Sequence, residues 1–218
     1  MPVMSSLPSR RKGLCLRAHR VTAVFLVLAG LWYGGRAQGG QVVLVVTTNY
    51  YVVTGTNYSG LRASIMLNRP WRDTFAYDAR TEWQARFSYS YRQRGGQQQG
   101  TDFEVRTRVT VTLPRWIPPQ PCDADLLRRW TQYFIGLMRH EQGHVRLARE
   151  ASAEINRRLE RLPAFPSARE LRATANSTFT NTLKEYQKKE QDYDRETQHG
   201  VTQGALFPHQ RVTPTRVS

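Results

Sequence analysis

The stretch MRHEQGHV at residues 138–145 lies in the middle of a long amphipathic run and contains a His-Glu-x-x-His pattern. In a helix of 3.6 residues per turn, residues four apart lie roughly 40° apart around the axis, so His140 and His144 present their imidazoles on one face. Two nitrogen ligands of one zinc ion need this spacing. Glu141 lies roughly 100° from His140, within reach of a metal-bound water without being a ligand.

The sequence around this motif predicts one long helix. Apolar residues recur at three- and four-residue steps between Asp123, a residue type that favours helix N-caps, and Pro163. His140 and His144 fall on the same side as these apolar residues, so both should point into the protein. A buried imidazole needs a hydrogen bond or a metal ion to offset its lost hydration. The motif is therefore interpreted as a metal site.

The residues before this helix predict a β-rich half. Residues 41–56 are rich in Val, Thr and Tyr and predict one or two strands. Residues 83–91 and 103–113 alternate as the two strands of a hairpin, joined by a long loop over residues 92–101. Prolines in residues 114–121 end this half. A second helix is predicted over residues 167–193. The expected fold is α+β: an N-terminal antiparallel β-sheet followed by two long helices that carry a zincin-like metal site.

Residues 1–37 have the three parts of a secretory signal peptide: a basic stretch, an apolar run and a small-residue exit ending at Ala37. The apolar run, residues 21–33, is shorter than the roughly 20 residues that span a bilayer. We therefore expect a secreted or periplasmic protein with no transmembrane anchor after processing.

The rest of the chain is long enough for one hydrophobic core. We predict a single zincin-like domain over residues 38–208, with a β-rich half at 38–116 and a helical half at 123–208, followed by a polar tail at 209–218. Removal of the signal peptide would also remove Cys15 and leave Cys122 alone. Neither a disulfide nor a Cys-x-x-Cys zinc site is then expected, so histidines and carboxylates must hold any metal.

The chain is basic, with a formal net charge of +15. Six of its 32 Lys/Arg residues and none of its 17 Asp/Glu residues precede residue 38, so 26 basic residues face 17 acidic ones in the remainder. This excess favours electrostatic association with anionic surfaces. No nucleic-acid-binding motif is present, and no specific nucleic-acid partner is expected.

A catalytic zinc ion takes three protein ligands and keeps one position open for water. His199 is the preferred third ligand, because it follows the predicted second helix and precedes Gly200, where a loop can turn a side chain back onto the first helix. Its alternative role is a cation at the helix C-terminus, which the helix dipole favours. Asp194 is the second choice, either as a ligand or as a partner that orients a ligand imidazole. The remaining candidates are His209, Glu190, Asp192 and Glu196.

Two motifs mark the helical half: HEQGHV at residues 140–145 and YDRETQHG at residues 193–200, the latter followed by QGA at 203–205. Three shorter stretches mark the β-rich half: YYVVTG at 50–55, TEW at 81–83 and LPRW at 113–116. Together they resemble a bacterial family of predicted secreted zinc-dependent proteases, otherwise a domain of unknown function, over nearly all of the expected mature chain. The resemblance implies a metal role for His140, His144 and His199 and a catalytic role for Glu141.

The expected function is hydrolysis of peptide bonds by a secreted zinc metallopeptidase. Zn²⁺ would lower the pKa of its bound water and polarise the scissile carbonyl, and Glu141 would pass the water's proton to the leaving amine. A peptide or protein substrate would bind along a sheet edge. Tyr193 is a candidate oxyanion stabiliser, with packing as its alternative role. Two other functions stay open: a zinc-containing envelope binding module without catalysis, and a zinc amidohydrolase acting on cell-wall amides.

Overall fold

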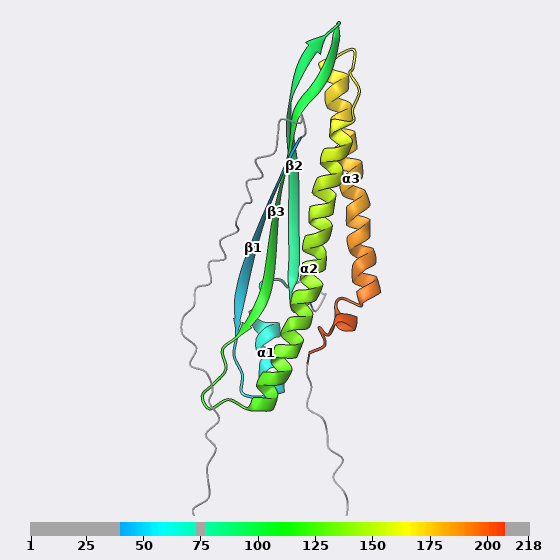
Figure 1. Cartoon of the computed structure of the whole chain (residues 1–218). Helices are drawn as coiled ribbons and strands as arrows, with labels where there is room; N and C mark the ends of the chain where they lie inside the picture. Colours follow the sequence, from blue (N-terminus) through cyan, green and yellow to red (C-terminus); the bar gives the residue numbers. More distant parts are fainter. Residues whose placement is uncertain (1–39, 73–76, 208–218) are drawn as a thin grey trace, which may run out of the picture.

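The computed structural model describes residues 40–72 and 77–207 (Figure 1). Its elements in chain order are β1 (Gln41–Val53), α1 (Tyr58–Asn68), β2 (Arg80–Arg94), β3 (Gln97–Trp116), α2 (Ala124–Glu160), α3 (Ala168–Thr197) and the 3₁₀ helix η1 (Val201–Gln203). The predicted signal peptide and all of the predicted C-terminal tail lie outside the described residues. Within the described part of the chain, no helix is long and apolar enough to span a bilayer.

The three strands form one mixed sheet in the order β1-β3-β2. As predicted, β2 and β3 form an antiparallel hairpin, but its turn is only Gly95 and Gly96, both with the positive φ that a tight two-residue turn requires. In contrast to the expected antiparallel sheet, β1 runs parallel to β3. The reason is that the antiparallel strand β2 carries the chain back to the end of the sheet at which β1 begins, so that β3 then runs in the same direction as β1.

Both predicted helices are present, and the α+β arrangement is confirmed. The N-cap of α2 is Asp123, whose side chain accepts a hydrogen bond from the Leu126 amide at 2.8 Å. The N-cap of α3 is Ser167, which accepts from the Glu170 amide at 3.2 Å. The helix α2 lies along one face of the sheet, and α3 packs beside α2 (Figure 1).

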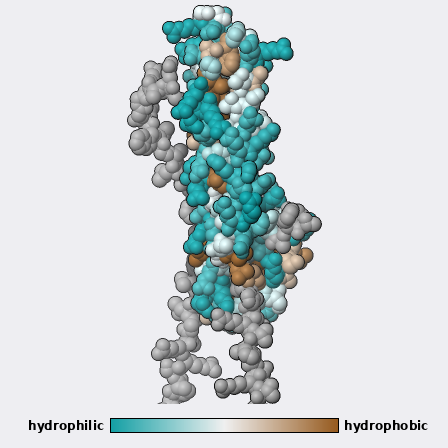
Figure 2. Space-filling view, turned by 90° about the vertical axis from the view of Figure 1, so that its right-hand side faces the viewer, coloured by the Kyte–Doolittle hydropathy of each residue, from teal (hydrophilic) through white to brown (hydrophobic). Residues whose placement is uncertain are grey.

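The core lies between α2 and the sheet. Leu137 and Ala148, which flank the His-Glu-x-x-His motif on α2, both belong to a large apolar cluster that includes Val109 of β3 and Tyr133 of α2. A second cluster around Ile155 continues the core toward the hairpin end. The side of the molecule toward α3 is largely hydrophilic (Figure 2). The motif is thus held on a helix that the core fixes before and after it.

Candidate metal centre

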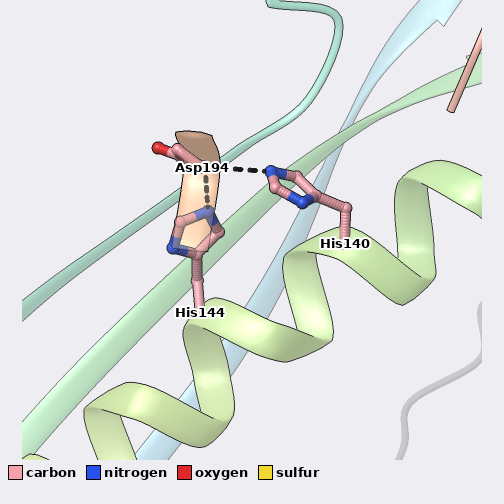
Figure 3. A group of neighbouring side chains, drawn as sticks. All are labelled: His140, His144 and Asp194. Carbon is pink, nitrogen blue, oxygen red and sulfur yellow. Dashed lines mark hydrogen bonds and ion pairs between the residues drawn. The ribbon is translucent and has the colours of Figure 1, made fainter. Parts of the chain in front are cut away.

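His140 and His144 of α2 meet Asp194 of α3 in one group (Figure 3). One potential ligand atom from each residue lies within 4.8 Å of the others. Asp194 Oδ1 is 3.2 Å from His140 Nε2 and 3.0 Å from His144 Nε2. Both histidines are buried and Asp194 is partly exposed. Imidazole nitrogens and a carboxylate oxygen are ligands that zinc and other transition metals take, so this group could bind a metal ion.

His199, the preferred third ligand from the sequence, lies beside this group without joining it. Its Nδ1 is 3.8 Å from Asp194 Oδ1, and its side chain is 48% exposed. The ring packs against Tyr77 at 4.9 Å between centroids. The structure therefore brings the second choice, Asp194, together with the two motif histidines and places His199 in the wall of the adjoining cavity.

The other carboxylate candidates lie in different surroundings. Glu190 is next to His144, but on the ring nitrogen that faces away from Asp194. Asp192 pairs on the surface with Lys188 and Arg195. Glu196 is exposed, and His209 lies outside the described residues. Of the three candidates that the structure describes, only Glu190 lies close enough to influence the group.

Each histidine of the group has a partner on its second ring nitrogen. His140 Nδ1 is 3.1 Å from Gln203 Oε1, which accepts a hydrogen bond when Nδ1 carries the proton. His144 Nδ1 is 3.6 Å from Glu190 Oε1, and the same oxygen accepts a hydrogen bond from the Trp83 indole at 2.6 Å. With a proton on Nδ1, the Nε2 lone pair of each ring is available to a metal ion bound beside Asp194.

Tyr193 covers Gly143 and supports His140 from behind. Its ring stacks on the His140 ring at 5.1 Å with an interplanar angle of 9°. Its hydroxyl donates to the His140 carbonyl at 3.0 Å and accepts from the Gln203 amide at 3.1 Å. A Cβ at Gly143 would overlap this hydroxyl. The space that Gly143 leaves is thus filled by Tyr193, and these contacts give Tyr193 a packing role.

Glu141 is only 3% exposed, and it lies next to the first residues of β2. Thr81 Oγ1 donates a hydrogen bond to Glu141 Oε2 at 2.6 Å. Burial raises the pKa of Glu141, and the Thr81 hydrogen bond and the nearby imidazoles offset this only in part. A carboxylate with a raised pKa is better matched to accepting a proton near neutral pH.

The group carries a linked pair of charges. Burial alone would lower the pKa of His144, but its contacts with Asp194 and Glu190 outweigh burial and raise that pKa to about 9. Burial alone would raise the pKa of Asp194, but hydrogen bonds with His140 and His144 hold it well below its usual range. At pH 7 the metal-free group therefore pairs an imidazolium with a carboxylate, and a metal ion must displace a proton to bind.

A cavity of about 920 Å³ opens onto the group. Its walls come from residues 77–81, from α2 and from the segment that runs from α3 to η1. Glu141 lines this cavity together with His140, His144 and Asp194. A substrate that enters it reaches the candidate metal ligands and the buried carboxylate at the same place.

Four residues of the site had no role in the sequence interpretation: Thr81, Trp83, Gln203 and, as a partner of His144, Glu190. Thr81, Trp83 and Gln203 belong to the TEW and QGA stretches, so the resemblance marked their positions but not their function. Periodicity could not reveal them, because a hydrogen bond between β2 and α2 depends on how the hairpin lies against the helix.

A family model described as a bacterial protein of unknown function (DUF922) matches residues 48–200. The matched residues run from β1 to the turn after α3 and include the candidate metal group. No curated protein matched the chain. No solved structure matched it either.

Proposed function

This chain belongs to that bacterial family of unknown function, and we propose that it is a secreted zinc-dependent peptidase. The observation that carries the proposal is the group of His140, His144 and Asp194 with the buried carboxylate of Glu141 next to it in one cavity. Secretion is supported by the signal-peptide pattern of residues 1–37.

In this proposal His140, His144 and Asp194 hold the zinc ion. Bound zinc would supply Lewis-acid polarisation of the scissile carbonyl and would lower the pKa of water toward neutrality. Glu141 takes a proton from the attacking water and delivers it to the leaving amine. Thr81 holds the Glu141 carboxylate in place through its hydrogen bond.

Asp194 is preferred to His199 as the third ligand. Its Oδ1 faces the Nε2 atoms of both motif histidines, whereas His199 is half exposed and approaches only Asp194. His199 then forms part of the substrate cavity. In the alternative arrangement, His199 would rotate onto the metal and Asp194 would orient an imidazole.

Two observations favour catalysis over a structural metal site in a binding module. The metal group found among the described residues has three members, which leaves one position of a tetrahedral zinc ion open. The carboxylate of Glu141 is buried beside that group without belonging to it. The same chemistry would hydrolyse an amide of the cell wall. A peptidase and a cell-wall amidohydrolase are therefore distinguished by which substrate the protein cleaves.

The test is Glu141→Gln, measured for both zinc content and hydrolysis of an unfolded protein. Zinc content should stay at one ion per chain, while the turnover rate should fall by about 10²–10⁴, the usual contribution of a general base. The matched control is Glu150→Gln, a surface position of α2 that lies outside the cavity. Unchanged hydrolysis by Glu141→Gln would remove Glu141 from its role, and a wild-type protein that binds no zinc would refute the proposal. Cleavage of cell-wall amides without proteolysis would favour the amidohydrolase.

A further inference from the structure

The geometry points to the free edge of β2, and the groove beside it, as the binding site for an extended peptide substrate, with Arg108 selecting an acidic side chain of that peptide. This inference rests on the proposed peptidase function. It assigns the path that a bound peptide follows from the metal site and the kind of side chain that the groove prefers in that peptide.

The groove is continuous with the metal cavity. A second cavity of about 810 Å³ lies between β2 and α3. Its lining shares Thr81, Gln187 and Glu190 with the cavity over the metal group. Thr81 contacts Glu141, and Glu190 contacts His144, so the shared residues are those that adjoin the site. A chain lying in both cavities would therefore pass directly by the proposed catalytic residue.

β2 can pair with such a chain. In the sheet order β1-β3-β2, β2 is an edge strand, and among the described residues it pairs with β3 alone. The unpaired backbone groups of an edge strand accept an extended peptide as an additional strand. Because β2 begins at Arg80 and runs away from the site, the added peptide would extend from the metal group along the groove toward the hairpin.

Both faces of β2 contribute to the groove. Trp83 and Ala85 face the helices, where they pack against the core clusters, and Glu82 and Gln84 point to the opposite face of the sheet. All four line the groove, which therefore wraps around the strand edge. Side chains of a paired peptide would alternate in the same way. One set would contact the Trp83 side, and the other would lie near Gln84.

Arg108 lies on this second face, directly opposite Gln84 in the β2–β3 register, and it lines the groove. Its side chain is exposed and makes no ion pair or hydrogen bond with any residue that the structure describes. In contrast to Arg108, two neighbouring charged groups are paired: Arg106 pairs with Glu104, and Glu82 pairs with Arg80 at 3.3 Å. The groove thus contains an uncompensated cation that a peptide carboxylate can reach.

Binding is best measured with the full chain carrying Glu141→Gln, so that hydrolysis does not interfere. The probes are labelled 12-residue peptides of Ala and Ser with one Asp, or one Lys, moved through successive positions. Fluorescence anisotropy at low salt should show one position where Asp binds about two- to fivefold more tightly than Lys, as expected for an exposed ion pair. Arg108→Glu should reverse this preference. The control Arg94→Glu, at the hairpin tip and outside the groove, should preserve it.

Strand addition is tested separately by methylating alternate backbone amides of the tightest Asp peptide. Methylation of one alternating set should weaken binding, and methylation of the other should not, because only one set faces β2. Equal binding of both methylated peptides and the parent would overturn strand addition. An Asp preference that survives Arg108→Glu would overturn the role of Arg108. If these peptides bind as expected and the wild-type protein hydrolyses none of them, the groove stands and the peptidase function fails.

Discussion

The packing of Tyr193 onto Gly143 gives a sharp prediction for Gly143→Ala. In an exposed helix interior this substitution would stabilise the protein by about 1 kcal/mol, because alanine has the higher helix propensity. Here the added methyl group would overlap the Tyr193 hydroxyl and the neighbouring ring atoms. Tyr193 would have to move away from α2, and its hydrogen bonds to His140 and Gln203 would be lost.

The magnitude follows from three contributions. Forcing an extra carbon into a packed contact costs about 1–3 kcal/mol. The two lost hydrogen bonds cost about 1 kcal/mol each. Subtracting the gain of about 1 kcal/mol in helix propensity leaves a destabilisation of about 2–4 kcal/mol for Gly143→Ala. The sign is therefore opposite to the one that helix propensity alone predicts.

The assay is urea denaturation of the metal-free protein, carried out on a double-mutant cycle with Tyr193→Ala. Without the tyrosine ring, Gly143→Ala should raise the free energy of unfolding by about 1 kcal/mol. Gly60→Ala is the control, since a methyl group there meets only the Asn57 side chain and the Gly55 Cα, at 3.3 and 3.7 Å. It should change the free energy of unfolding by less than about 1 kcal/mol. If Gly143→Ala is neutral or stabilising in the wild-type background, the packing account is refuted.

Three further predictions concern the metal group. Asp194→Asn should abolish stoichiometric zinc binding while His199→Ala retains it, as measured by metal analysis after dialysis, and the opposite pattern would restore His199 as the third ligand. Glu190→Gln should keep the Trp83 hydrogen bond but remove the negative charge beside His144 Nδ1, and it should weaken zinc binding about 10- to 100-fold in chelator competition, the usual effect of mutating an imidazole's outer partner; unchanged affinity would show that the charge of Glu190 does not support His144 as a ligand. The pKa of His144, about 9, lies above its ordinary value of 6.5, so in metal-free protein this group adds stability that is full below pH 6.5 and is lost as the pH rises toward 9. Zinc affinity should increase over the same window, and a pH-independent affinity in calorimetric titrations would contradict the displaced proton.

The sequence predicted the part of the site that lies on one helix. Spacing at 3.6 residues per turn put His140 and His144 on the apolar side of α2, and both are buried there. It also predicted the N-cap at Asp123 and the start of the second helix at residue 167, because local residue types determine how a helix begins. Interactions within one element are encoded locally, and they were predictable for that reason.

The choice between Asp194 and His199 as the candidate third ligand depended on where the second helix ends. Sequence patterns predict the end of a helix poorly. The second helix was expected to stop near Tyr193, which would have left Asp194 in a loop and His199 free to turn back. In fact α3 continues to Thr197, so Asp194 is still helical and faces α2. His199 instead lies in a left-handed turn with φ of 51°. Because α3 is four residues longer than predicted, Asp194 and not His199 lies with the two motif histidines.

The direction of β1 could not be predicted for a related reason. The Val, Thr and Tyr content of Gln41–Val53 indicates a strand, but it carries no information on whether the neighbouring strand runs in the same direction. The same holds for the edge position of β2 and for the approach of Thr81 to Glu141. These features depend on how the strands are arranged in the sheet and against the helices, and that arrangement is a property of the whole fold.

The parallel pairing of β1 also imposes an order of assembly on the newly made chain. Gln41 pairs with Glu104, so β1 has no partner until β2 and most of β3 have been synthesised, whereas β2 and β3 can close locally around Gly95 and Gly96. Until then the 13 residues of β1, which contain no charged side chain, expose a β-forming segment that is prone to associate with other chains. Of the three strands that the structure describes, the first to be made is therefore the last to be protected.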